Sequence, residues 1–159
     1  MYKNLFLTII LSLFFLSSAH SEIIDFIRAC DRGNPLACTR VSKEYRSNGQ
    51  NNYAERYAEK GCNLNEGGSC FILGYLLLEP AELNKTKLSR SSAQKIFNLI
   101  KKSCDLNSPQ GCAGLAMLYE RENSVMSALS ITPNTVKAKQ YYRKGCQLGY
   151  QRACELYKK

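Results

Sequence analysis

The stretch "CDLNSPQGC", residues 104–112, holds two cysteines with seven residues between them. The same interval returns three more times, and the four pairs use all eight cysteines of the chain: Cys30 and Cys38, Cys62 and Cys70, Cys104 and Cys112, Cys146 and Cys154. Because the interval never changes and no cysteine is left over, each pair is treated as one structural unit.

Residue types that end and start helices surround each pair. Three residues after each first cysteine stands a glycine or an asparagine, the types that most readily adopt the left-handed conformation ending a helix: Gly33, Asn65, Asn107 and Gly149. Asn34 and Ser108 then suit N-caps, and Pro35 and Pro109 suit the first position of a new helix. Each pair therefore spans one αα-hairpin turn, with its Cα atoms near the roughly 5.5 Å separation of a disulfide.

Zinc coordination is the alternative use of so many cysteines. Zinc sites usually combine closely spaced C-x2-4-C pairs with histidines, whereas this sequence has no such pair and its single histidine is His20. The C-x-x-C-H motif of haem attachment is absent as well. We therefore expect four disulfides, no metal and no cofactor.

The first residues, "MYKNLFLTIILSLFFLSSAHS", have the layout of a secretory signal peptide. Lys3 is a short positive region, an apolar run follows it, and small residues come next. We expect cleavage after Ser21 or after Ala19; an uncleaved anchor is the alternative, for which the apolar run is short. Disulfides persist outside the cytosol. The sequence predicts a signal peptide over 1–21, one domain over 22–159 without a membrane span, and a secreted or periplasmic protein.

The charge of the domain is strongly positive. Without Lys3, 21 of the 22 basic residues remain against 13 acidic ones, which leaves a net charge of +8. Such a charge favours anionic surfaces, for example lipopolysaccharide, phospholipid headgroups or an acidic protein. The basic residues are scattered and no DNA-binding motif accompanies them, so we expect no nucleic-acid partner.

The cysteine pairs recur at intervals typical of stacked repeats, since the first cysteines are 32, 42 and 42 residues apart. After the second cysteines an apolar, a small and an apolar residue recur on one helical face: Val41, Ser42 and Tyr45; Leu73, Gly74 and Leu77; Leu115, Ala116 and Tyr119. A second amphipathic helix precedes each later pair. We predict eight helices, at residues 22–31, 35–47, 52–64, 67–78, 90–106, 109–121, 135–148 and 151–158.

The repeats resemble a known family. The elements "LGYLLLE", "LAMLYE" and "AKQYYRKGCQLGYQRAC" are similar to Sel1-like (Sel-one-like) repeats, relatives of the tetratricopeptide repeat, in the disulfide-stapled form of the Helicobacter cysteine-rich proteins. The resemblance covers essentially the whole predicted domain and implies an all-α α-solenoid of αα-hairpin repeats, each stapled by a C-x7-C disulfide. The chain departs from the family in its repeat lengths and lacks the G-x-G-V turn at "RSNGQNNY", "EPAELNKTKLSRSS" and "RENSVMSALSITPNTV".

The resemblance also implies an alternative function, because cysteine-rich members of the family have been described as penicillin-binding proteins with weak β-lactamase activity. One S-x-x-K motif is present, from Ser92 to Lys95, in which the amine could activate the hydroxyl. No S-D-N or K-T-G motif accompanies it. We interpret Ser92 as a helix N-cap with Lys95 in solvent. This favours a protein without a catalytic site, and β-lactams or cell-wall fragments are the ligands of the alternative.

Binding along a groove has a better physical basis, because a solenoid exposes a concave surface lined by the first helix of each pair. One and five residues after the second cysteines, off the expected core face, lie Thr39 and Lys43, Phe71 and Tyr75, and Ala113 and Met117. An extended protein or peptide ligand with acidic character would suit a groove with an apolar middle and a basic end. The predicted groove residues are Arg40, Lys43, Arg46, Phe71, Tyr75 and Met117. The alternative is that Phe71 and Tyr75 are core residues, since "CFILGYLLLE" is apolar nearly all round.

The connection over residues 121–136 is longer than a plain link requires, and it mixes apolar residues with serine and asparagine. It can fold into a short extra helical turn, and connections of this length are often functional or disordered. From sequence we thus predict an exported, cysteine-rich repeat protein that binds proteins or peptides in host or envelope interactions. A secreted effector acting on host proteins and a weak β-lactamase are the two alternatives.

Overall fold

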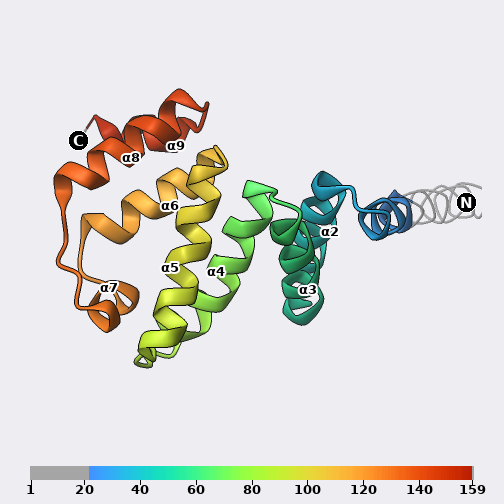
Figure 1. The fold of residues 1–159 in the computed structure, drawn as a ribbon, viewed down its shortest axis with the longest axis horizontal. Helices are drawn as coiled ribbons and strands as arrows, with labels where there is room; N and C mark the ends of the chain where they lie inside the picture. The colour runs from blue at the N-terminus through green and yellow to red at the C-terminus, as the bar shows by residue number, and fades with distance from the viewer. Residues whose placement is uncertain (1–21, 159) are drawn as a thin grey trace, which may run out of the picture.

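The computed structural model describes residues 22–158, so the signal peptide predicted over 1–21 lies outside the described residues. Within 22–158 every regular element is helical. Figure 1 shows the helices side by side in a row that follows the order of the chain. After a helical segment at 22–31 the elements are α2 (Pro35–Ser47), α3 (Asn51–Asn63), α4 (Gly67–Leu83), α5 (Arg90–Asp105), α6 (Pro109–Glu120), α7 (Ser124–Leu129), α8 (Thr135–Gln147) and α9 (Gln151–Tyr157). The all-α repeat fold is confirmed.

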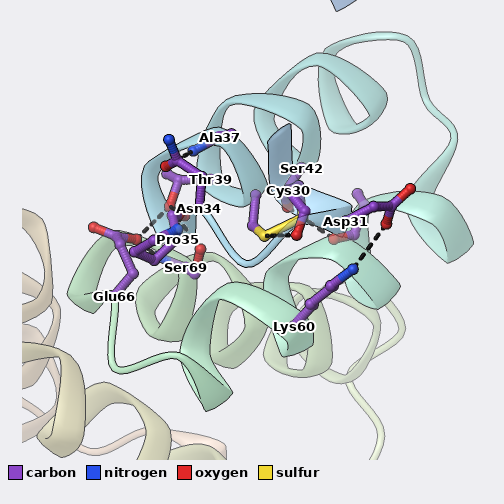
Figure 2. The surroundings of a disulfide bond; sticks show 12 residues. Cys30, Asp31, Asn34, Pro35, Ala37, Thr39, Ser42, Lys60, Glu66 and Ser69 are labelled. Atoms are coloured by element: carbon purple, nitrogen blue, oxygen red, sulfur yellow. Dashed lines mark hydrogen bonds and ion pairs between the residues drawn. A yellow bond between two sulfur atoms is a disulfide. The ribbon is translucent and has the colours of Figure 1, made fainter. Parts of the chain in front are cut away.

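Four disulfides staple the tight turns, with the pairing predicted from the spacing. The bonds Cys30–Cys38, Cys62–Cys70, Cys104–Cys112 and Cys146–Cys154 have Cα separations of 4.7, 4.5, 4.3 and 4.6 Å. Each bond joins the last turn of one helix to the first turn of the next, and Figure 2 shows the first of them between 22–31 and α2. The αα-hairpin with its staple is therefore the repeating unit.

The same hydrogen bonds end the first helix of every hairpin. The residue three places after the first cysteine has a positive φ, of 91° at Gly33, 61° at Asn65, 58° at Asn107 and 94° at Gly149. The N–H of this residue donates to the carbonyl of the first cysteine. The N–H of the next residue donates to the carbonyl of the residue just before that cysteine, and all these distances are 2.9 or 3.0 Å. This is the Schellman motif. The Asn34 and Ser108 side chains cap the next helices, as predicted, by accepting from Ala37 N–H and Gly111 N–H.

The residues immediately before the two cysteines face each other across the hairpin. In the second hairpin a Cβ added to Gly61 would lie 2.1 Å from Ser69 Oγ. In the third hairpin the residue types are exchanged, and a Cβ added to Gly111 would lie 2.0 Å from Ser103 Oγ. In these two hairpins the space between the helices thus holds one of these side chains but not two, which lets the stapled helices approach closely.

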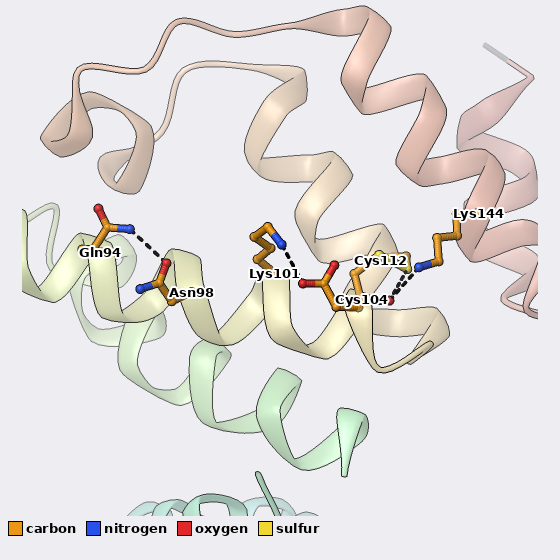
Figure 3. A network of polar contacts seen from close by, with 7 residues as sticks. Gln94, Asn98, Lys101, Cys104, Cys112 and Lys144 are labelled. Atoms are coloured by element: carbon orange, nitrogen blue, oxygen red, sulfur yellow. Dashed lines mark hydrogen bonds and ion pairs between the residues drawn. A yellow bond between two sulfur atoms is a disulfide. The ribbon is translucent and has the colours of Figure 1, made fainter. Parts of the chain in front are cut away.

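A lysine two places before a first cysteine links each repeat to the one before it. Lys102 Nζ donates to the carbonyl of Cys62 and Lys144 Nζ to that of Cys104, each at 2.9 Å, the second bond being drawn in Figure 3. Lys60, at the same place, donates to Asp31 Oδ1 at 2.8 Å (Figure 2). Carbonyls at a helix C-terminus carry partial negative charge, so the ammonium groups of Lys102 and Lys144 stabilise the C-terminal end of the first helix in the preceding hairpin.

One predicted helix end is wrong, and the long connection contains a helix beyond the eight predicted. Helix α4 was expected to end at residue 78, but it continues through Pro80 to Leu83. The extra turn buries Ala81 to 6% exposure where α4 packs against α7, and this packing offsets the hydrogen bond lost at the proline. The long connection forms α7, the extra helical turn considered above, with Val125 and Met126 fully buried. The other predicted bounds differ from the structure by one residue at most.

Candidate binding surface

One predicted basic residue and one predicted aromatic residue meet where α2 contacts α4. The Arg46 Cζ atom lies 4.3 Å from the centre of the Tyr75 ring, and Arg46 Nη2 lies 3.9 Å from Glu79 Oε1. The Tyr75 residue is 36% exposed, as is the Arg46 side chain. A guanidinium at this distance from a tyrosine ring makes a cation–π interaction. Arg46 and Tyr75 therefore present a combined positive and aromatic surface.

Phe71 continues this surface towards the next repeat. Its ring centre lies 6.4 Å from that of Tyr75, and a Cβ added to Gly114 in α6 would lie 2.8 Å from Phe71 Cε2. The half-buried Phe71 ring therefore rests on α6 where a side chain is missing. Met117 follows Gly114 by three residues, on the same face of α6, and is 45% exposed. We call Arg46, Tyr75, Phe71 and Met117 the aromatic strip.

Arg40 and Lys43 lie nearer to the N-terminus of α2 than Arg46 does. The Arg40 Cζ atom lies 5.3 Å from the centre of the Phe26 ring, and Arg40 Nη2 lies 3.6 Å from Glu22 Oε1, so this guanidinium contacts the segment 22–31. Lys43 is exposed. Because the three basic residues of α2 are spaced by three, they form one basic stripe that runs from the segment 22–31 to Tyr75.

Two residues expected off the core face are buried, which corrects that part of the predicted pattern. Ala113 is 3% exposed and Thr39 is 7% exposed. Thr39 Oγ1 donates to Glu66 Oε2 and lies 2.6 Å from Ser69 Oγ, as Figure 2 shows, while Glu66 caps α4 by accepting from two of its N–H groups. The residue just after the second cysteine thus faces the neighbouring repeat. The residue five places after the second cysteine is exposed in the first three hairpins, at Lys43, Tyr75 and Met117.

The S-x-x-K motif begins inside the first turn of α5. Ser89 is the N-cap, because its side chain accepts from Ser92 N–H at 3.1 Å, so the interpretation of Ser92 as the cap is wrong. Ser89 Oγ also donates to Ser92 Oγ at 2.9 Å, and Lys95 is exposed, as expected. Ser89, three residues before the predicted cap, therefore starts α5, and Ser92 lies in the first turn of the helix.

Tyrosine stacks at equivalent positions between repeats were not predicted. Tyr45 stacks on Tyr57 with ring centres 5.6 Å apart, and Tyr119 stacks on Tyr141 at 5.8 Å. In both cases the first residue lies seven places after a second cysteine and the second lies five places before the next first cysteine. Burial, with a smaller effect of Asp31, raises the pKa of Tyr57. The matching positions in the sequence are the signal that could have revealed these contacts.

Metal and membrane sites were also considered over the described residues. Between residues 22 and 158, no group of three or more His, Cys, Asp or Glu side chains is placed to hold a metal ion. In the same range no helix is long and apolar enough to cross a bilayer. All eight cysteines are oxidised in pairs, which leaves no thiol among them for nucleophilic chemistry.

Comparison with known proteins supports the repeat architecture. No protein-family model and no curated protein matches the sequence. Among solved structures, the chain is similar to cysteine rich protein B from Helicobacter pylori, with 26% identity and a TM-score of 0.57 over 86% of this chain and 92% of that one. It is also similar in fold to a Sel1 repeat protein from Oxalobacter formigenes, with 18% identity and a TM-score of 0.61. That match covers 85% of this chain, which spans about half, 52%, of the Oxalobacter chain.

The likeness to the Helicobacter cysteine rich protein covers most of both chains. All four disulfides close the same turn of the same unit. In its helical repeat fold and its stapled hairpins, the chain therefore resembles the cysteine-stapled Sel1-like repeat proteins.

Proposed function

We propose that this chain is an exported protein-interaction module that binds an extended peptide with apolar and acidic residues along α2, α4 and α6. The observation that carries the proposal is the partly exposed Tyr75 ring with the Arg46 guanidinium 4.3 Å above its centre. Four disulfides support export, because such bonds persist outside the cytosol. The repeat fold supports an interaction role, since stacked hairpins present extended binding surfaces.

The aromatic strip supplies apolar anchors. Tyrosine is enriched among the residues that dominate binding energy, because its ring buries a large area and its hydroxyl remains able to form hydrogen bonds. The flexible thioether of Met117 can adapt to different apolar side chains. Phe71 lies between them as a half-buried base. Spacing of such anchors along neighbouring helices suits a ligand in an extended conformation.

The basic stripe explains the preference for acidic residues. Arg40 and Arg46 each face one carboxylate, at 3.6 Å in the pair with Glu22 and 3.9 Å in the pair with Glu79. Ion pairs this long between exposed groups contribute little. A carboxylate of the ligand can therefore exchange with them at small cost. Lys43 between them adds a third positive charge. Binding should weaken as salt rises, because exposed charges are screened over about 10 Å at 0.1 M salt.

Selection from a peptide library tests the proposal. The oxidised protein would be panned against a phage-displayed library of random linear peptides, and the enriched peptides synthesised and titrated calorimetrically. We expect enriched sequences in which acidic residues flank an apolar stretch. Tyr75→Ala should weaken their binding by about 1 kcal/mol or more, roughly fivefold, without lowering the melting temperature sharply.

Tyr157→Ala is the matched control, because Tyr157 has nearly the same exposure, 39%, but lies in α9. It should leave peptide affinity unchanged. The proposal fails if no peptide is enriched, or if the enriched peptides bind the Tyr75→Ala and Tyr157→Ala variants equally well. A sharp fall in melting temperature for Tyr75→Ala, with no salt-sensitive binding by the wild type, would identify Tyr75 as a core residue instead.

A further inference from the structure

The two long connections of the chain meet and enclose a cleft. The turn between α4 and α5, residues 84–89, lies on one side of it and α7 on the other. The cleft has a volume of about 500 Å³. Pockets that bind small molecules usually fall between about 300 and 1,000 Å³, so this cleft is large enough for such a ligand.

Contacts between segments far apart in the sequence join the two sides of the cleft. Ser124 Oγ at the start of α7 donates to Glu82 Oε1 in the last turn of α4. Leu88 packs against the core cluster that contains Val125, Met126 and Leu129. The extension of α4 beyond Pro80 brings Ala81 and Glu82 to the cleft. Core packing therefore positions Ala81 and Leu88 in the lining.

The lining combines an apolar base with two cations. Ala81, Leu88 and Ala128 supply the apolar part. Lys85 and Lys87 are exposed at the cleft, and Glu82 is the acidic residue among the lining side chains. One carboxylate oxygen of Glu82 already accepts a hydrogen bond from Ser124, so Glu82 has less capacity to form an ion pair with Lys85 or Lys87. Positive charge thus predominates beside an apolar surface, which favours a ligand with a negative group and an apolar body.

We propose that this cleft binds a small amphipathic organic anion, with its apolar body against Ala81, Leu88 and Ala128 and its anionic group beside Lys85 and Lys87. This site is separate from the peptide surface, because none of its lining residues belongs to the aromatic strip or to the basic stripe. Its presence or absence is therefore independent of peptide binding.

Three probes of matched chemistry test the proposal by NMR titration of the oxidised, nitrogen-labelled protein. Cyclohexanecarboxylate carries the charge and the apolar body, cyclohexylmethanol carries the body alone, and inorganic phosphate carries the charge alone. We expect saturable amide shifts from cyclohexanecarboxylate, centred on residues 81–88 and 124–128. Each of the other two probes should bind at least about tenfold more weakly, because each lacks either the apolar or the charged contact.

Variants of exposed lining residues locate the site. The double variant Lys85→Gln with Lys87→Gln should weaken cyclohexanecarboxylate about tenfold, since two exposed charge contacts are lost. Ser127→Trp, an exposed position in the lining, should fill the cleft and abolish the shifts. Lys95→Gln, which replaces an exposed lysine outside the lining, should bind the probe as the wild type does.

Several results would overturn the proposal. These are the absence of local shifts at the highest soluble probe concentration, equal affinity for the carboxylate and the alcohol, or wild-type affinity in the double lysine variant. Wild-type affinity in a Ser127→Trp protein with an unchanged melting temperature would overturn it as well. Thermal melts of every variant separate loss of binding from loss of fold.

Discussion

Gly61 and Ser69 occupy one shared space between the helices of the second hairpin, where a Cβ on Gly61 would lie 2.1 Å from Ser69 Oγ. Ser103 and Gly111 fill the equivalent space of the third hairpin in the opposite order. Ser103 Oγ there donates to the carbonyl of Gly67 in the preceding repeat at 2.6 Å. The fold thus accepts a serine on either helix, provided that glycine stands opposite.

Gly61→Ser should therefore lower the free energy of unfolding by about 1 to 3 kcal/mol, the usual cost of overpacking a tight interior. Adding Ser69→Gly to the same chain should recover most of that loss, because it recreates the arrangement of the third hairpin. Urea denaturation of the single and double variants measures both effects. If the loss of unfolding free energy in the double variant equals the sum of the losses in the two single variants, the shared-space interpretation is wrong.

Lys102 provides a second test of contacts between repeats. Replacement by methionine keeps the apolar part of the side chain but removes the ammonium group that binds the carbonyl of Cys62 at 2.9 Å. We expect the free energy of unfolding to fall by about 0.5 to 1.5 kcal/mol, in line with charges at helix termini and with hydrogen bonds.

Lys101→Met is the matched control for Lys102→Met. Lys101 is the preceding residue of α5 and makes an exposed pair with Asp105 at 2.6 Å, drawn in Figure 3. Its removal should change stability less, because exposed pairs are screened by solvent. Equal losses in the two methionine variants, measured in the same denaturant series, would argue against a specific role of the carbonyl contact.

The fourth disulfide should be the first to be reduced. Cys146 and Cys154 are partly exposed, whereas the other six cysteines are at most 3% exposed. Access of a reductant to sulfur governs its rate of attack. Stepwise treatment with a thiol reductant, followed by alkylation and peptide mapping, should detect Cys146 and Cys154 before any other cysteine. Earlier alkylation of a buried pair would contradict this order.

Complete reduction should unfold the domain. Each bridge closes a loop of about nine residues, and the chain-entropy model then assigns roughly 2.5 kcal/mol to it, so four bridges give at most about 10 kcal/mol. Whole domains are stable by only about 5 to 15 kcal/mol. The far-UV circular dichroism of the fully reduced protein should therefore show the loss of helix, and an unchanged spectrum would show that core packing alone suffices.

Tyr142 should make the protein sensitive to alkali. Its hydroxyl donates to Glu120 Oε2 at 2.9 Å, and burial, together with this hydrogen bond, raises its pKa well above the ordinary tyrosine value. A phenol with a raised pKa in the folded state contributes its full stability below the unfolded pKa near 10 and loses it as the pH rises further.

Tyr142→Phe should accordingly cost about 1 kcal/mol at neutral pH and reduce the fall in stability above a pH of about 10. Denaturation midpoints measured across this range check both statements. Tyr53→Phe, at an exposed position, should keep the wild-type pH dependence. If Tyr142→Phe still loses stability steeply above this pH, the loss arises from the titration of other groups.

The repeating unit could be predicted from the sequence because its determinants are local. Cysteine spacing and the glycines or asparagines that follow act within about ten residues, the range over which turn chemistry operates. The choice between Ser89 and Ser92 as the cap of α5 is different. Both residues suit an N-cap, and the packing of Ala93 and Ile96 in the core selects the helix start.

The cleft could not be predicted, because its parts come from two connections that are not equivalent in the repeat pattern. Ser124 and Glu82 are separated by 42 residues, and nothing in either segment specifies the other. Helix α4 passes through Pro80, which normally indicates a helix end, and tertiary packing that buries Ala81 accounts for the extension. Tertiary contacts thus override a local signal where the chain departs from its regular repeat.

The eight-residue separation within every disulfide has a consequence for how the protein acquires its bonds. When a chain emerges gradually, each cysteine meets its native partner before the next pair is available, and short loops close within about 100 ns. Oxidation can therefore proceed pair by pair from the N-terminus, and each bond that forms closes one hairpin turn. Such a chain has little need of disulfide reshuffling, because the nearest partner is always the correct one.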